Sequence, residues 1–230
     1  MPQRKYNKTR RRPRRRAPAR RRTAKVPRSL VQKVIPFKRD LEATLNLTGS
    51  GPPEGWSVSG NRIYKALGWS LSSLGNYTDF TNLFRNYRIK AARVRLYFSN
   101  TMSGVEDSNS HANSQILVRM APNHRGQSDA LDDAYWATIQ AKKYKLGLNG
   151  GKPLDIYMPL VQRNELTSST GTGTSTMSPK FISTDTSNVV HWGLNMSFER
   201  ADGQAFSSGF ANTQRVRMIT TLYFQMKGVE

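Results

Sequence analysis

The chain has 230 residues, with 36 Lys and Arg against 15 Asp and Glu, and therefore a formal net charge of +21. It contains no cysteine, which excludes disulfides, thiolate metal sites and a cysteine nucleophile. No apolar run approaches the roughly 18–20 residues that span a bilayer, and none follows the charged N-terminus, so we expect neither a membrane span nor a secretory signal.

The first 39 residues hold most of the positive charge. They contain 17 Lys or Arg and no acid, so they carry +17 of the +21 and leave +4 for the other 191 residues. Because like charges repel and prolines interrupt the segment, we expect it to be disordered by itself. The sequence therefore predicts two parts: an Arg-rich arm, residues 1–39, and a domain, residues 40–230, long enough for a single core.

A polyanion would relieve the repulsion within the arm, and the planar fork of arginine suits phosphate oxygens. We predict that the arm binds nucleic acid through its backbone, without reading sequence. The residues assigned this role are Arg4, Lys5, Lys8, Arg10, Arg11, Arg12, Arg14, Arg15, Arg16, Arg20, Arg21, Arg22, Lys25 and Arg28. Two alternatives stay open: a nuclear import signal, which can coexist with binding, and an anionic membrane, although the arm lacks interleaved anchoring aromatic or Leu residues.

Beyond the arm, the apolar pattern predicts strands joined by long loops. The eight predicted strands are 41–47, 63–71, 87–98, 114–121, 142–148, 153–161, 189–198 and 214–227. Short helices are predicted at 79–86 and 129–141. Segments 48–60 and 167–179 have the composition of loops, and the second is predicted to be exposed and mobile. Strands do not alternate regularly with helices, so we predict an all-β fold, an eight-stranded antiparallel sandwich or jelly roll.

No motif in the sequence predicts catalysis or a bound cofactor. The three histidines lie in different predicted elements, and none has a partner at metal-binding spacing. The aspartates within 129–133 are better explained by a helix N-terminus than by a calcium site. There is no nucleophile elbow, zinc-protease or paired-carboxylate pattern. We therefore predict that the protein is not an enzyme and has no metal and no cofactor.

Four short motifs occur in a fixed order along the domain. Residues 87–98 read YRIKAARVRLYF, residues 152–155 KPLD, residues 191–194 HWGL and residues 215–226 RVRMITTLYFQM. In this order they resemble strands D, G, H and I of circovirus capsid proteins and of their relatives among circular Rep-encoding single-stranded DNA viruses. The Arg-rich start resembles the packaging arm of the same proteins.

The resemblance implies one jelly roll of two four-stranded sheets, B-I-D-G and C-H-E-F, and a closed icosahedral T=1 shell of sixty copies. The arm would lie inside on a single-stranded DNA genome and would bind host nuclear import receptors. The loops would form subunit contacts and the outer surface, which would meet an unidentified cell-surface receptor. The expected locations are the virion and, during assembly, the host nucleus. Two alternatives stay open: a coat protein that packages RNA, and a cellular basic protein of ribosomal or chromatin type, although such proteins usually have a basic folded surface as well.

Strand phase adds a second candidate surface. On 87–98 and 214–227, the core-facing residues share one phase, which puts four arginines on the opposite face: Arg93, Arg95, Arg215 and Arg217. The resemblance makes these strands neighbours. Neither strand carries an acid, so the guanidinium groups would repel unless something anionic covers them. Two interpretations stay open: acids of a neighbouring subunit or solvent face them, or they line the shell interior and extend the phosphate-binding surface.

Overall fold

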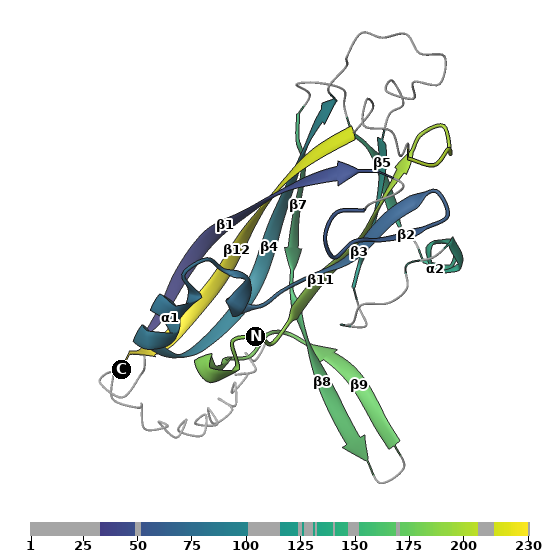
Figure 1. Cartoon of the computed structure of the whole chain (residues 1–230). Helices are drawn as coiled ribbons and strands as arrows, with labels where there is room; N and C mark the ends of the chain where they lie inside the picture. Colours follow the sequence, from purple (N-terminus) through teal and green to yellow (C-terminus); the bar gives the residue numbers. More distant parts are fainter. Residues whose placement is uncertain are drawn as a thin grey trace, which may run out of the picture. The chain divides into compact units, whose positions relative to one another are not determined.

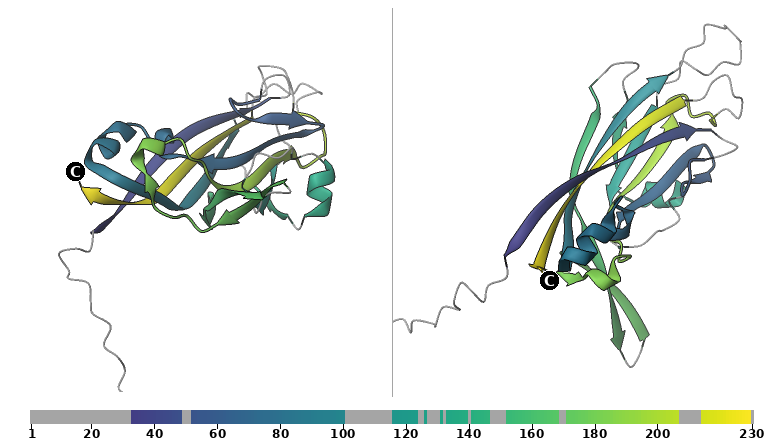
Figure 2. Two further views of the ribbon diagram at one scale, coloured as in Figure 1. Left: turned by 90° about the horizontal axis from the view of Figure 1, so that it is seen from below. Right: turned by 60° about the vertical axis from the view of Figure 1, so that its left-hand side comes forward.

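The computed structural model describes residues 33–48, 52–100, 116–123, 126, 131, 133–139, 141–146, 152–168, 171–206 and 214–229. These residues form two antiparallel sheets that face each other (Figures 1 and 2). The predicted all-β jelly roll is thereby confirmed. The arm residues 1–32 lie outside the described part. No helix in the described ranges is long and apolar enough to cross a membrane.

The first sheet is built on three long strands. β1 (Val34–Leu47) pairs with β12 (Gln214–Val229), and β12 pairs with β4 (Phe84–Asn100). On its other edge β4 pairs with β7 (Leu154–Pro159) and with the short β10 (Ile182–Ser183). The order β1-β12-β4-β7 corresponds to the expected B-I-D-G sheet.

The second sheet has the order β2-β3-β11-β5-β6. Its strands are β2 (Ser57–Ser59), β3 (Arg62–Trp69), β11 (His191–Arg200), β5 (Ile116–Pro122) and β6 (Lys142–Lys145). The last four correspond to the expected C-H-E-F sheet. A hairpin of β8 (Val161–Ser168) and β9 (Gly171–Met177) joins this sheet through two residue pairs between β8 and β11, and extends away from the sandwich (Figure 1).

The core lies between the sheets. Alternate residues of β4 and β12, such as Val94, Leu96 and Val216, are almost fully buried, and they face Ile63 and Phe198 from the second sheet. The strand phases predicted for these segments are therefore the observed ones, because a strand with one face against a core must alternate.

An aromatic cluster closes one end of the core. Phe37 of β1 stacks on Phe224 of β12 with ring centroids 5.6 Å apart. It meets the edges of Phe80 and Phe84 at 5.4 and 5.7 Å. Phe80 belongs to α1 (Tyr77–Leu83), the helix expected at 79–86. The cluster ties the beginning of β1 to the body of the domain.

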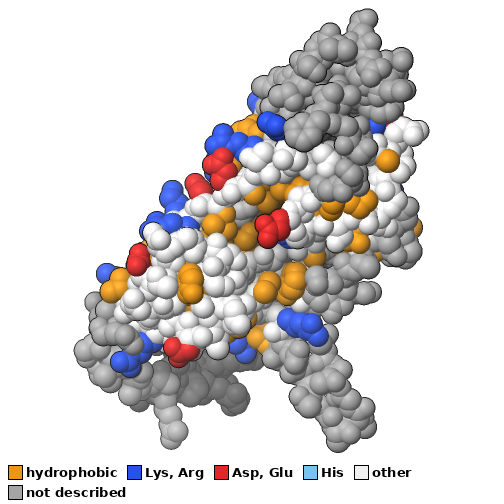
Figure 3. All heavy atoms as spheres, in the orientation of Figure 1, with side chains coloured by type: hydrophobic (Ala, Val, Ile, Leu, Met, Phe, Trp, Pro, Cys, Tyr) orange, Lys and Arg blue, Asp and Glu red, His pale blue; other side chains and the backbone are white. Residues whose placement is uncertain are grey.

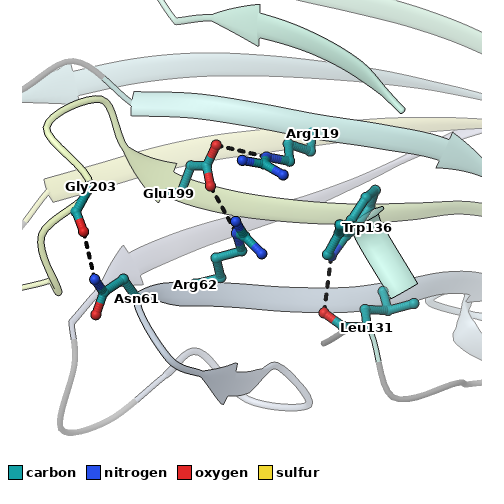
Figure 4. Close-up of polar contacts among 7 residues, drawn as sticks. All are labelled: Asn61, Arg62, Arg119, Leu131, Trp136, Glu199 and Gly203. Carbon is teal, nitrogen blue, oxygen red and sulfur yellow. Dashed lines mark hydrogen bonds and ion pairs between the residues drawn. The ribbon is translucent and has the colours of Figure 1, made fainter. Parts of the chain in front are cut away.

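The second helix, α2 (Asp133–Thr138), packs on the face of the second sheet that points away from the main core. Trp136 and Leu131 bury against Ala121 of β5 in a separate apolar cluster. The Trp136 indole N–H donates to the Leu131 carbonyl oxygen at 3.0 Å (Figure 4). This is the described part of the helix expected at 129–141.

Several sequence expectations need correction. Residues 84–86, expected to end the first helix, begin β4, and the segment 48–60, expected to be a loop, contains β2. The first strand begins at Val34 instead of residue 41, so residues 34–39, counted with the arm because of their charge, pair with β12. The strand expected at 63–71 ends at Trp69, because Leu71 begins a 3-10 turn (Leu71–Ser73). The segment 167–179 is not simply a loop, since it contains β9. Its alternating threonines are good strand formers, and a hairpin ladder needs no apolar face.

Candidate nucleic-acid interface

We call the side of the first sheet that faces away from the core the outer face. It carries many polar and charged side chains. Across β1, β12, β4 and β7 the strand registers place these residues in rows. One row reads Glu42, Ile219, Arg95, Asp155, and the next reads Asp40, Thr221, Arg93, Tyr157. All four predicted arginines, Arg93, Arg95, Arg215 and Arg217, lie on this face.

Arg93 and Arg217 have acidic partners. The Arg93 guanidinium donates from both Nε, at 2.8 Å, and Nη2 to the carboxylate of Asp155 on β7. Arg217 forms an ion pair with Glu42 on β1. The acids thus come from flanking strands of the same chain. The expectation that only solvent, a neighbouring subunit or a bound anion could face these arginines is therefore wrong for these two.

The ion pairs shift the pKa values of their members in the directions expected for opposite charges. The hydrogen bond from Arg93 lowers the pKa of Asp155, and the one from Arg217 lowers the pKa of Glu42. The pKa of Arg93 is raised, by Asp155 first and to a smaller extent by Tyr223. These groups are exposed, so the pairs fix geometry more than they stabilise the fold.

Arg95 and Arg215 differ from the other two. The described residues provide no carboxylate within ion-pair distance of either. Arg95 donates from Nη2 to the Thr221 hydroxyl at 3.3 Å, and Thr221 in turn donates to Asp40. The Arg95 Nε is buried and has no hydrogen-bond partner within the described structure. Both arginines therefore leave positive charge available on the outer face.

Two further cations lie on this face that the sequence reasoning did not single out. The guanidinium of Arg88 and the ammonium of Lys227 both lie over the ring of Phe181, at 4.5 and 4.8 Å from its centroid. Arg88 also donates to Gln225 at 2.8 Å. Lys227 shares the strand phase that selected Arg215 and Arg217, so that phase could have found it. Arg88 could not be found in this way, because a register shift between Ile89 and Ala91 puts it out of phase with Arg93 and Arg95.

The outer face is positive in balance. At the paired positions of these strands its cations are Lys38, Arg88, Arg93, Arg95, Arg215, Arg217 and Lys227, and its carboxylates are Asp40, Glu42 and Asp155. Seven cations against three acids leave a formal excess of four positive charges. In the space-filling view, basic and acidic side chains are interspersed along the edge of the molecule next to β1 (Figure 3). The face therefore attracts polyanions while its local pairs keep it ordered.

The arm residues predicted to bind nucleic acid, from Arg4 to Arg28, lie outside the described residues. Of the basic residues of the predicted arm, the structure describes Lys33, Lys38 and Arg39, just before or within β1. Among the described residues there is also no group of three or more His, Asp or Glu side chains that could hold a metal ion.

The second sheet has a basic cluster of another kind. Glu199 accepts hydrogen bonds from Arg62 Nε at 2.8 Å and from Arg119 Nε at 2.7 Å (Figure 4). The cluster lines a polar cavity of about 460 Å³ together with Lys143. Burial raises the pKa of Glu199, but the two guanidinium groups outweigh it and the net direction is downward. This network joins β3, β11 and β5 and is mainly structural.

A jelly-roll domain that follows a separate cationic segment is the organisation expected of a small-virus coat protein. The family model described as circovirus capsid protein matches residues 3–230. The chain belongs to this family, and it is a capsid protein, a structural component of the virion.

One solved structure agrees on the fold. The BFDV capsid protein in a 60-mer crystal structure is similar with a TM-score of 0.51 and 15% identity, over 86% of this chain and 94% of that chain. The decameric BFDV capsid protein gives a TM-score of 0.41 and 15% identity, over 85% and 99% of the two chains. The mud crab tombus-like virus structure gives 0.42 and 13%, over 90% and 96%. No curated protein sequence matches the chain.

Proposed function

We propose that this capsid protein self-assembles into a closed icosahedral shell of sixty copies and packages single-stranded DNA through its Arg-rich arm. The observation that carries the proposal is the separation of charge: 17 basic residues and no acid stand in the first 39 residues, ahead of a nearly neutral domain. Such a cationic segment binds a phosphate backbone by releasing counterions, whatever the base sequence. The 60-mer of the similar BFDV protein supports the shell.

The outer face extends the phosphate-binding surface in this proposal. It would line the interior of the shell, where its excess charge, counted without Lys38 of the arm, adds three positive charges to those of the arm. The arm also serves as the nuclear import signal, because a run such as residues 10–22 is dense in arginine. Assembly would then take place in the host nucleus.

Deletion of residues 1–32 tests packaging. This boundary is chosen because Val34 begins β1, and removal of residues 1–39 would also remove Phe37 from the aromatic cluster. We expect particles that assemble but contain little nucleic acid, measured by the ratio of absorbance at about 260 and 280 nm and by electron microscopy. Truncated particles with the nucleic-acid content of the full-length protein would contradict the assignment.

The nuclease sensitivity of the packaged nucleic acid distinguishes DNA from the alternative of RNA. Nucleic acid extracted from full-length particles made in infected cells should be degraded by DNase and resist RNase. The opposite sensitivity would replace DNA by RNA in the proposal and leave the role of the arm intact, since the phosphate backbone carries the binding in both.

A further inference from the structure

Tyr157 is the most exposed of the large hydrophobic side chains that the described residues include, with 65% of its surface accessible. It lies on β7 at the edge of the outer face, directly across from Arg93. Its neighbours in the strand, Ile156 and Met158, point to the core side, so the phase of β7 holds the ring outward. A large aromatic surface is thus presented among cationic side chains.

A second aromatic ring supports Tyr157. The Tyr157 and Tyr223 rings meet edge to face, with centroids 5.9 Å apart and planes at 63°. Their strands are not neighbours, because β4 runs between them. Ala91 of β4 lies between Tyr223 and Pro159 in register, and its small side chain leaves room for the two rings to meet above it. The contact fixes the orientation of Tyr157 and leaves most of the ring open.

Positive charge lies on both sides of this pair along the strands. Arg93 and Arg95 are on one side, where Asp155 offsets one of their two charges, and Arg88 with Lys227 is on the other. An exposed aromatic ring within a cationic track is the arrangement that binds single-stranded nucleic acid, where phosphates meet the cations and an unpaired base stacks on the ring. A duplex keeps its base faces inside its own stack and cannot use such a ring.

We propose that Tyr157, held by Tyr223, is a stacking site for an unpaired base of the packaged strand. This inference rests on the proposed function, in which the outer face contacts nucleic acid. It adds that the outer face recognises bases as well as phosphates, and that it discriminates in favour of single strands.

The test compares two ligands of equal charge, an oligodeoxythymidine and the same oligonucleotide with abasic residues, each binding to the full-length protein. Stacking on one ring predicts that the wild type binds the base-containing strand about tenfold more tightly than the abasic strand. Tyr157→Phe keeps the ring and should keep this ratio. Tyr157→Ser removes the ring and should abolish most of the tenfold preference. The arm contributes to both ligands alike, so the ratio isolates the base contact.

Two measurements protect the test from a folding artefact. The thermal unfolding midpoint of Tyr157→Ser should stay close to that of the wild type, because the ring is exposed. In the unmodified protein, photocrosslinking to an oligonucleotide with 5-iododeoxyuridine should mark the peptide that contains Tyr157.

The outcomes separate the two proposals. Failure of the full-length protein to bind either oligonucleotide would overturn the proposed function. Binding with a ratio that Tyr157→Ser leaves unchanged, or crosslinks confined to other peptides, would overturn the stacking site alone. Loss of particle assembly in Tyr157→Ser with an unchanged ratio would show that the ring contacts a second copy of the chain instead of a base.

Discussion

His191 is fully buried between the sheets although its side chain can ionise. Its Nδ1 lies 3.1 Å from the Val189 carbonyl oxygen, and its ring lies beside that of Tyr87. Burial lowers the pKa of His191 from 6.5 to about 4. The folded protein therefore keeps this imidazole neutral across the range in which an unfolded chain would protonate it.

This shift predicts a pH dependence of stability. Between pH 6.5 and about 4 the unfolded state binds a proton that the folded state does not, so the free energy of unfolding falls as the pH is lowered. From about pH 7.5 to about pH 5 the loss should be about 2 kcal/mol from this residue. Urea unfolding of wild type and His191→Gln at both pH values checks it: the wild type should lose about 2 kcal/mol more. Equal losses would contradict the assignment.

Glu199 and Glu42 form ion pairs in different surroundings. The Glu199 side chain is 11% exposed and serves two arginines, whereas that of Glu42 is 51% exposed and serves one. Glu199→Gln should lower the free energy of unfolding by about 2–3 kcal/mol, because Arg62 and Arg119 lose their counter-charge in a largely buried site. Glu42→Gln is the matched control and should cost less than about 1 kcal/mol. Similar costs in denaturant unfolding would show that burial does not distinguish the pairs.

At the scale of the strands, the outer face offers a test that leaves the arm untouched. Arg95→Gln with Arg215→Gln removes two cations that form no direct ion pair among the described residues. If both contact phosphates of a single strand, the slope of log affinity against log salt should become shallower by about 1.4. Lys142→Gln with Lys143→Gln on β6 makes the same charge change on the other sheet and should leave the slope nearly unchanged. An equal effect of both pairs would mean that net charge, not this face, governs binding.

Features that depend on the period of a single strand could be predicted from the sequence, whereas features that depend on which strands pair could not. The face shared by Arg93 and Arg217 follows from the period of two, because β4 and β12 each bury one side. The ion pairs to Asp155 and Glu42 could not be predicted, since they depend on which strands flank β4 and β12 and in what register. The start of β1 at Val34 could not be predicted, because the charges of Lys38 and Arg39 are like those of the arm. The inward packing of Phe37 shows that this segment belongs to the domain. The hairpin strand β9 was missed because its stability does not come from apolar alternation.

At the scale of the whole molecule, the charge of the arm can be compared with the number of phosphates that a shell would hold. In a shell of sixty copies, arms of +17 would bring about 1,000 positive charges to the interior, enough to offset a similar number of phosphates. The amount of packaged nucleic acid should then follow the charge of the arm and not the detail of its sequence, because backbone contacts carry no base readout.

Replacement of six arginines by Gln tests this relation: Arg10, Arg11, Arg12, Arg14, Arg15 and Arg16. The arm then falls from +17 to +11, and the packaged nucleotides per particle should fall by about a third, because fewer phosphates are offset. Lys at the same six positions keeps the charge and should restore the content, although lysine lacks the bidentate fork. The measurement is nucleotides per particle, from absorbance and particle mass. A loss that Lys does not restore would show that guanidinium geometry, not total charge, determines how much nucleic acid the shell holds.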